Sequence, residues 1–192
     1  MAKLGVSNFI SLNGFYKGAN EDISWNKQRE EEEHQYAVES LKKDDILLFG
    51  RKTYELMVSY WTSKMALESD PIVAERMNNS DKMVFSNKLE TVGWNKTKLI
   101  KGNIVEETKK IKKDSENDIT ILGSGTIVTQ LADAGLIDKY ELIVYPFIIG
   151  EGTPLFNGIK NKLELELTEM KTFKSGTVIL CYEPKRMYEK TF

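Results

Sequence analysis

The segment Asp118–Thr126, with the residues after it, constrains the fold more than any other part of the chain. Its apolar run stops at Gly123-Ser124-Gly125, and apolar residues then return at helical spacing from Ile127 to Ala134. This order predicts a buried strand, a tight turn and an amphipathic helix. Thr126 is the expected N-cap of that helix and Gly135 is its expected C-cap.

The two glycines of this turn suit the binding of an anion. Glycine lets the backbone approach a ligand closely, and the first N–H groups of the helix then point at that ligand. Phosphate is the group that such a geometry favours. Glycines also occur in strand-to-helix turns for steric reasons alone, so the segment by itself leaves both interpretations open.

A second predicted strand-to-helix turn carries positive charge. The apolar run Asp45–Gly50 is typical of a strand buried on both faces, and Arg51-Lys52-Thr53 follows it directly. If a helix begins near Thr53, two cations and its free N–H groups converge on one point, which suits a phosphomonoester. The alternative is a solvated surface pair of cations. Two anion sites in one small protein would suit a dinucleotide.

The remaining segments alternate between strand-like and helix-like patterns. Apolar runs predict strands at residues 3–12, 82–86, 97–101 and 140–149, and helical patterns predict helices at 24–43, 53–61, from 71 onward and at 103–113. Pro146 predicts an edge position or a bulge for the 140–149 strand, and residues 150–156 are expected to form a loop. Residues 162–170 and 177–182 predict a terminal antiparallel hairpin. The fold class is therefore α/β with a mainly parallel sheet.

Composition excludes several classes of function. Lys and Arg number 27 against 29 Asp and Glu, which argues against a chain-wide electrostatic grip on nucleic acid or membrane. No apolar run approaches the ~20 residues of a membrane helix, and Cys181 is the one cysteine, so no internal disulfide can form. We expect a cytoplasmic protein with one domain over residues 1–192.

The sequence is poor in nucleophiles and general bases. His34 is the one histidine, and neither zinc-site spacing nor a Gly-x-Ser-x-Gly or Gly-x-x-x-x-Gly-Lys motif is present. No metal is therefore expected, and no catalytic residue is assigned. This composition is compatible with hydride transfer, in which a cofactor carries the reaction and the protein binds and orients.

In combination, these segments resemble the dihydrofolate reductase fold. More closely, they are similar to its bacterial branch related to the RibD C-terminal (reductase) domain of riboflavin biosynthesis. The segments that carry the resemblance are Gly50–Glu55, Val84–Ser86, Leu122–Ile127, Leu136–Leu142, Pro146 and Leu155-Phe156. The resemblance covers nearly the whole chain in order. It implies a three-layer α/β fold with a mostly parallel central sheet and a C-terminal antiparallel hairpin.

Proteins of this family bind NADPH, and the resemblance implies which residues would hold it. Gly50, Arg51, Lys52 and Thr53 would take cofactor phosphates, with Ser86 and Asn87 near the adenosine 2′-phosphate, while Gly123, Ser124, Gly125 and Thr126 would meet the pyrophosphate. Ser11, Asn13 and Gly14 would lie in the loop over the nicotinamide.

The sequence departs from the dihydrofolate reductase pattern at one point. Those enzymes carry two adjacent glycines joined by a cis peptide bond, whereas here the second is Ser124. A cis bond between residues other than proline costs about 3 kcal/mol, so the isomer at Gly123-Ser124 is left open.

The substrate site is less defined by the sequence. Dihydrofolate reductases hold the pterin ring with a carboxylate on their first helix, and the candidates here are Glu30, Glu32 and Glu33. Trp25, Tyr54 and Trp61 are candidate walls of a ring-binding pocket, although aromatic residues at such spacings are more often core.

Three functions remain open at this point. The first is an NADPH-dependent reductase of a heterocyclic substrate, most similar to 5-amino-6-(5-phosphoribosylamino)uracil reductase or dihydrofolate reductase. The second is an NADP(H)-binding protein of the same fold without significant turnover, and the third is a structural dimer module with no ligand. By analogy we expect a homodimer through the 140–149 strand or the terminal hairpin.

Overall fold

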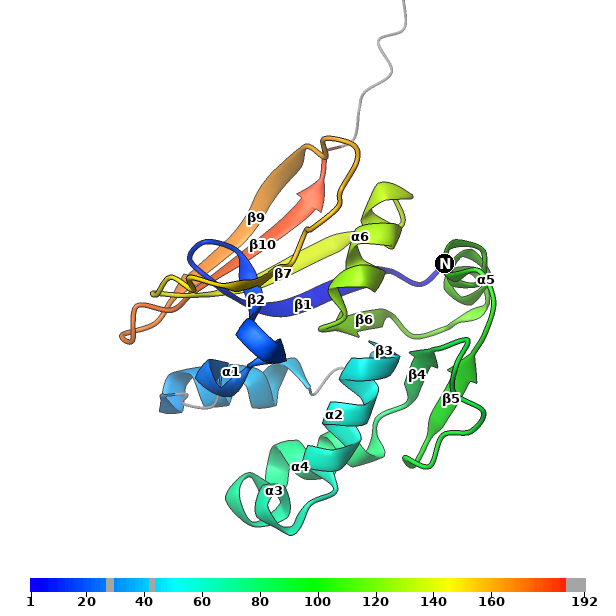
Figure 1. Cartoon of the computed structure of the whole chain (residues 1–192), viewed down its shortest axis with the longest axis horizontal. Helices are drawn as coiled ribbons and strands as arrows, with labels where there is room; N and C mark the ends of the chain where they lie inside the picture. The colour runs from blue at the N-terminus through cyan, green and yellow to red at the C-terminus, as the bar shows by residue number, and fades with distance from the viewer. Residues whose placement is uncertain (27–29, 42–43, 186–192) are drawn as a thin grey trace, which may run out of the picture.

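The computed structural model describes residues 1–26, 30–41 and 44–185. Its central feature is an eight-stranded sheet with the strand order β5-β4-β3-β6-β1-β7-β10-β9 (Figure 1). The strands are β1 (Leu4–Ser11), β3 (Ile46–Gly50), β4 (Lys82–Phe85), β5 (Thr97–Ile100), β6 (Ile119–Leu122), β7 (Lys139–Tyr145), β9 (Leu165–Thr172) and β10 (Val178–Pro184).

Six neighbouring strands of this sheet are parallel, and an antiparallel hairpin of two strands completes the sheet at one end. β1 lies between β6 and β7, with Val6 paired to Ile121 on one side and to Tyr140 on the other. β10 runs antiparallel to β7 and to the outermost strand β9. The predictions of a mainly parallel sheet and of a terminal antiparallel hairpin are therefore confirmed.

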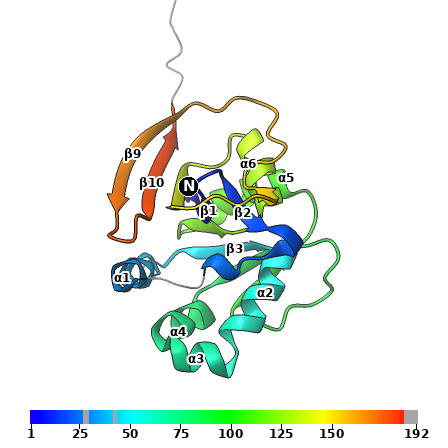
Figure 2. The same cartoon turned by 60° about the vertical axis from the view of Figure 1, so that its left-hand side comes forward.

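Helices cover both faces of the sheet (Figure 2). The helices are α1 (Glu31–Ser40), α2 (Arg51–Trp61), α3 (Lys64–Ser69), α4 (Pro71–Asn79), α5 (Ile104–Asp114) and α6 (Gly125–Asp133). Alternation along β3 divides the core, because Leu47 and Phe49 pack toward α1, α2 and α4, whereas Leu48 packs toward α5 and α6. The result is three layers, with a sheet between two layers of helices.

Two short 3-10 helices, at Ala19–Glu21 and Ser24–Asn26, precede α1. The helix predicted over residues 24–43 was therefore too long: α1 covers Glu31–Ser40, and residues 27–29 and 42–43 of that prediction lie outside the described part. Three glutamates occupy its first turn, as the helix dipole favours.

Helix ends follow the predicted chemistry at most positions. Asp70 caps α4, with Pro71 in the first turn, and Asn103 caps α5. Gly135 has φ +65° just after α6, as expected of a helix C-terminus. The prediction of Thr126 as the N-cap was wrong, because α6 begins at Gly125 and Ser124 occupies the N-cap position, two residues earlier than predicted.

The segment around Pro146 differs from the prediction. β7 ends at Tyr145 and lies between β1 and β10, so Pro146 follows an interior strand and occupies neither an edge strand nor a bulge. Residues 150–156 also contain more than a loop, because β8 (Gly152–Pro154) pairs antiparallel with β2 (Phe15–Gly18). This small second sheet fixes the segment after β1 against the segment after β7.

Candidate active site

The predicted cofactor residues lie in four turns at one edge of the sheet. These turns follow β4, β3, β6 and β1, which are neighbours in the sheet and run parallel, so their carboxyl ends meet at that edge. Ligand sites of open α/β sheets form at this edge. The structure therefore brings together segments that extend from Ser11 to Thr126 in the chain.

The turns after β3 and β6 contact each other directly through Ser124. The Ser124 hydroxyl accepts a hydrogen bond of 2.7 Å from the Gly50 N–H and donates one of 2.9 Å to Thr53 Oγ1. A Cβ atom at Gly50 would lie 2.9 Å from Ser124 Oγ, and one at Gly123 would lie 3.0 Å from Thr53 Cγ2. Glycine is thus required at both positions by the close approach of the two turns.

The two helices that begin at these turns lack side-chain caps. Neither α2 nor α6 has a side-chain hydrogen bond to the N–H groups of its first turn, whereas α3, α4 and α5 are capped by Ser63, Asp70 and Asn103. The first N–H groups of a helix have no partner within the helix. Two adjacent, uncapped helix starts are therefore suited to oxygen atoms of a bound anion.

The backbone at Gly123-Ser124 takes a left-handed path. Gly123 has φ +65° and Ser124 has φ +60° and ψ +60°. The described residues contain no cis peptide bond, so the Gly123–Ser124 bond is trans.

The two cations of the β3–α2 turn lie in exposed ion pairs. Arg51 pairs with Glu55 at 2.9 Å, and Lys52 pairs with Glu21 at 3.3 Å. Ion pairs at such exposed positions contribute little to stability, so an incoming phosphate would compete with them at small cost.

Ser86 and Asn87 order the turn after β4. The Ser86 hydroxyl accepts hydrogen bonds from the N–H groups of Lys88 and Leu89. The Asn87 side chain accepts a hydrogen bond from the Gly102 N–H and donates one to the Gly102 carbonyl. This turn is thereby tied to the turn after the edge strand β5.

The loop after β1 is tied to the segment after β7. The Asn13 side chain donates to the Ile149 carbonyl and accepts from the Ile149 N–H. Ser11 donates to Asn13 Oδ1 and accepts from the Phe15 N–H, and Gly14 between them has φ +82°. The structure thus gives Ser11 and Asn13 internal partners and places Gly14 where a left-handed turn is needed.

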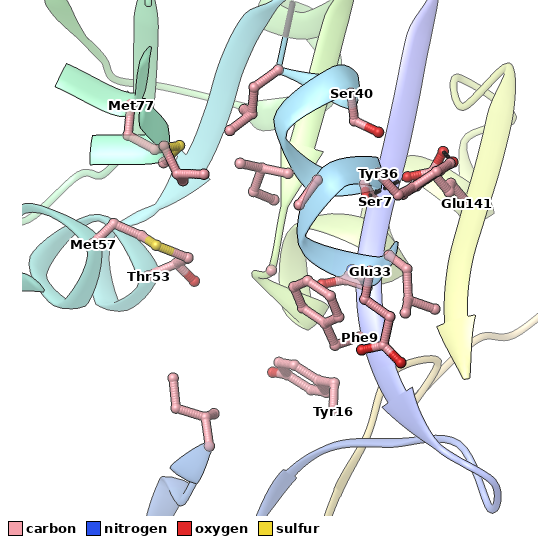
Figure 3. Close-up of a pocket in the computed structure, with 18 of the residues that line it drawn as sticks. Ser7, Phe9, Tyr16, Glu33, Tyr36, Ser40, Thr53, Met57, Met77 and Glu141 are labelled. Atoms are coloured by element: carbon pink, nitrogen blue, oxygen red, sulfur yellow. Dashed lines mark hydrogen bonds between the residues drawn. The ribbon is translucent and has the colours of Figure 1, made fainter. Parts of the chain in front are cut away.

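Tyr16, just beyond this loop, lies against the start of α6. A Cβ atom added to Gly125 would approach the Tyr16 ring to 2.8 Å. Tyr16 also lines the cavity described next (Figure 3). No sequence pattern indicated this contact.

A cavity of about 210 Å³ opens beside these turns, on the sheet face that α1, α2 and α4 cover (Figure 3). Thr53, Gly123 and Ser124 of the two turns belong to its lining. Most of the other lining residues are apolar, among them Phe9, Ala37, Leu41, Leu56, Met57, Val73, Met77, Ile143, Phe173 and Ile179. Small-molecule sites are typically lined in this way, with a few polar groups that orient the ligand.

Glu33 is the acidic residue of α1 that faces inward. It is 6% exposed, lines the cavity and accepts a hydrogen bond from the Ser175 hydroxyl. Glu32 instead pairs with Lys174, and Glu30 is exposed at the N-cap position. Of the three candidates, Glu33 is thus the one that lines the cavity.

A second polar group in the cavity wall was missed by the sequence reading. Glu141 on β7 accepts hydrogen bonds of 2.8 Å from the Ser7 hydroxyl and 2.9 Å from the Tyr36 hydroxyl. Burial, and then the Glu141 charge, raises the pKa of Tyr36 above its usual range, so Tyr36 remains a neutral donor. The one sign of this group in the sequence is that a carboxylate, Glu141, stands inside the apolar run 140–149.

The three aromatic residues that were predicted to form pocket walls do not lie around one cavity in the structure. Trp61 lines the cavity, whereas Trp25 packs against Tyr145 and Phe147 and is not among the described lining residues. Tyr54 is buried beside Trp94, and its hydroxyl accepts from the Gly93 and Trp94 N–H groups, away from the cavity. Trp61 is therefore the candidate we retain.

The described residues show neither a metal-binding cluster nor a membrane-spanning helix. Within residues 1–26, 30–41 and 44–185, no group of three His, Cys, Asp or Glu side chains is placed to hold a metal ion. In that part of the chain, no helix has both the length and the apolar composition that crossing a bilayer requires.

This chain is similar in sequence to a protein of Bacillus subtilis and in structure to a protein of Shewanella. Protein YyaP of Bacillus subtilis is 29% identical over 173 residues, which cover 90% of each chain. The crystal structure of a putative riboflavin biosynthesis protein from Shewanella sp. PV-4 superposes with a TM-score of 0.73 and 19% identity, over 97% of this chain and all of that one.

Dihydrofolate reductase provides the second structural comparison. The enzyme from Enterococcus faecalis, solved in complex with NADP(H), superposes with a TM-score of 0.64 and 15% identity, over 95% of this chain and 96% of that one. The fold is therefore dihydrofolate reductase-like, as the resemblance implied. The family model of the RibD C-terminal domain matches residues 2–179, and the chain accordingly belongs to the RibD C-terminal domain family.

Proposed function

We propose that this protein is an NADPH-dependent reductase of a flat heterocyclic substrate, in the class of 5-amino-6-(5-phosphoribosylamino)uracil and dihydrofolate. The family and the fold support a reductase-type function. The single observation that carries the finer proposal is the hydrogen-bonded contact of two uncapped helix starts beside an apolar cavity.

The residues present fit a dinucleotide phosphate. Two glycine-containing turns expose backbone N–H groups at neighbouring positions, which suits the two phosphates of a pyrophosphate. In this proposal Gly123, Ser124, Gly125 and Thr126 hold the pyrophosphate, while Arg51, Lys52 and Thr53 take phosphate oxygens with Ser86 and Asn87 nearby. Ser11, Asn13 and Gly14 belong to the loop over the nicotinamide. When bound, NADPH supplies the hydride.

The cavity provides the other half of the proposed reaction. Its apolar walls exclude water from a ring, and Trp61 contributes one of these walls. Glu33 would accept hydrogen bonds from amino and ring N–H groups of the heterocycle, and the Ser175 hydroxyl would fix the carboxylate. Such orientation places the substrate ring beside Gly123 and Ser124, where the cofactor would lie.

Assembly and location are also part of the proposal. We propose a cytoplasmic homodimer that forms through the terminal hairpin. Because β7 is an interior strand, it offers no free edge to a second copy, whereas β9 is outermost and exposes Leu167 and Met170.

Nucleotide binding followed by turnover tests the proposal. NADPH should raise the melting temperature, because a ligand that binds only the folded state stabilises it, and NADH should raise it less. Consumption of NADPH, followed by its absorbance, should then depend on a dihydropteridine or aminouracil substrate. A shift with NADPH but no turnover on either class would favour the binding protein without catalysis. Absence of a shift with both nucleotides would contradict the whole proposal.

A further inference from the structure

The segment from Tyr16 to Glu21 contacts both of the helix starts that are assigned to cofactor phosphates. Tyr16 lies against the start of α6, because a Cβ atom added to Gly125 would approach its ring to 2.8 Å. At the other end of the segment, the Glu21 carboxylate lies 3.3 Å from Lys52 Nζ at the start of α2. We call Tyr16–Glu21 the strap. The strap thus extends from one proposed phosphate-binding turn to the other.

The Glu21 carboxylate joins two lysines beside these turns. Its Oε2 atom lies 3.0 Å from Lys17 Nζ and 3.3 Å from Lys52 Nζ. The hydrogen bond from Lys17 is the largest cause that lowers the pKa of Glu21 below its usual range, and Lys52 adds to it, so Glu21 stays ionised at neutral pH. An anionic oxygen is therefore already present at the ammonium group that the proposed function gives to a phosphate.

The backbone of the strap is strained where Glu21 makes these contacts. Asn20 has φ +53° and ψ +32°, and Glu21 has φ +64°. Residues other than glycine rarely take this left-handed conformation, and glutamate takes it less readily than asparagine. Such residues persist where surrounding contacts hold them. Here the Gly18 N–H closes the turn by donating to the Asp22 carbonyl at 2.8 Å, and the ion pairs of Glu21 add to that restraint.

A phosphate at the start of α2 would remove one of these restraints. Two anionic oxygens at one exposed ammonium group repel each other, so a phosphate oxygen at Lys52 Nζ takes the place of Glu21 Oε2. The existing ion pair is weak, because the side chains of Lys52 and Glu21 are 63% and 52% exposed. A phosphate also receives the free N–H groups of α2, which the Glu21 carboxylate leaves without a side-chain cap. The phosphate therefore displaces the carboxylate at small cost.

We propose that Glu21 is a resident competitor of the bound phosphate: its carboxylate pairs with Lys52 in the ligand-free protein, and the phosphate displaces it. The proposal rests on the proposed function, which gives Lys52 to a cofactor phosphate, and it adds a residue that sets the affinity for that phosphate. Displacement also frees the left-handed turn at Asn20 and Glu21. Glu21 thereby lowers the affinity of the site and couples the strap to the binding of an anion at the start of α2.

Removal of the Glu21 charge tests this inference. Glu21→Gln keeps the length of the side chain and loses the competing anion, so inorganic pyrophosphate should bind about threefold more tightly in titration calorimetry at low salt. Glu68→Gln is the matched control, because Glu68 pairs with Lys64 at 3.6 Å on α3, and it should leave the dissociation constant unchanged. Unchanged or weaker binding to Glu21→Gln, or no pyrophosphate binding to wild type or either variant, would overturn the inference.

A second background distinguishes competition at Lys52 from a general effect of removing one negative charge. In Lys52→Met, the ammonium group for which Glu21 and the phosphate compete is absent. Adding Glu21→Gln to this variant should therefore no longer tighten pyrophosphate binding. A cooperative melting transition of each variant shows that it is folded. The same gain in both backgrounds would contradict the proposed competition.

The two nucleotides separate this inference from the proposed function. Wild type and Glu21→Gln are titrated with NADPH and with NADH. A gain for NADPH alone assigns Lys52 to the 2′-phosphate, a gain for both nucleotides assigns it to the pyrophosphate, and both results support the competition. If pyrophosphate binds more tightly to Glu21→Gln but neither nucleotide binds, the cofactor assignment fails and the competition stands. If NADPH and pyrophosphate each bind equally to both proteins, the competition is wrong and the cofactor assignment stands.

Discussion

Ser124 donates a hydrogen bond of 2.9 Å to Thr53 across the boundary between two strand-to-helix turns that are 71 residues apart in sequence. The same hydroxyl accepts from the Gly50 N–H, so one serine joins the start of α2 to the start of α6. A glycine at position 124 would keep the left-handed backbone and lose this link. Ser124 therefore sets the spacing of the two proposed phosphate-binding turns.

Two substitutions at Ser124 distinguish the contribution of its hydroxyl to stability from that of its left-handed backbone. Ser124→Ala loses both hydrogen bonds and keeps a Cβ atom at φ +60°, so the free energy of unfolding should fall by about 1 to 2 kcal/mol. Ser124→Gly should lower the free energy of unfolding by less, because glycine adopts this conformation at no steric cost. Both should weaken NADPH binding. Urea unfolding and NADPH titration measure the two effects, and equal stability of the two variants would contradict this account.

The cations after β3 should decide the nucleotide preference. Arg51→Ala combined with Lys52→Ala should remove most of the difference in affinity between NADPH and NADH, because one phosphate distinguishes the two cofactors. Lys64→Ala, which breaks a comparable exposed pair with Glu68 on α3, is the control and should change neither affinity. Fluorescence titration gives both dissociation constants. A preference that survived the double substitution would place the 2′-phosphate elsewhere.

Local sequence patterns predicted the two strand-to-helix turns because each pattern lies within one turn. The apolar run before Gly123 and the one before Arg51 predicted their strands, and the residues after them predicted that a helix follows each strand, although α2 and α6 both begin two residues earlier than expected. Parallel strands then place all such turns at one edge, whatever their order in the sheet. The prediction needed no knowledge of long-range pairing.

The cavity beside these turns could not be predicted in this way, because it depends on which face of each helix turns inward and on residues distant in the sequence. The run Glu30–Glu33 does not show which residue faces inward, and the hydrogen bond that marks Glu33 comes from Ser175, 142 residues later. The position of Tyr54 in the apolar pattern of α2 is one that a cavity residue could occupy. Its hydroxyl instead accepts a hydrogen bond from the Gly93 N–H. The pairing of β2 with β8 likewise depends on a long-range contact that no local signal encodes.

Gly125 should tolerate no side chain while Tyr16 is present. Gly125→Ala would place Cβ 2.8 Å from the Tyr16 ring, so we expect a loss of about 1 to 3 kcal/mol in the free energy of unfolding and weaker NADPH binding. In a Tyr16→Ala background the same substitution should cost less. A double-mutant cycle of unfolding free energies measures this coupling. Additive effects would show that the ring and the glycine do not constrain each other.

Lys82 should make stability depend on pH in a direction unusual for a lysine. Its side chain is almost fully buried, and Nζ donates to the carbonyls of Met77, Asn78 and Ser80. Burial lowers the pKa of Lys82 to about 8, from the ordinary value of 10.5 that the unfolded chain retains.

Between pH 8 and 10.5 the unfolded state therefore binds more protons than the folded state, and the free energy of unfolding should rise with pH through this window. Lys82→Met removes the titrating group, so the stability of the wild type relative to this variant should increase by about 1 to 2 kcal/mol from pH 8 to pH 10. Lys98→Met, at an exposed position on the neighbouring strand β5, is the control and should not reproduce the increase. Urea unfolding at stepped pH measures the differences. A difference that stayed constant, or decreased with rising pH, would mean that the carbonyl acceptors keep the Lys82 ammonium charged in spite of its burial.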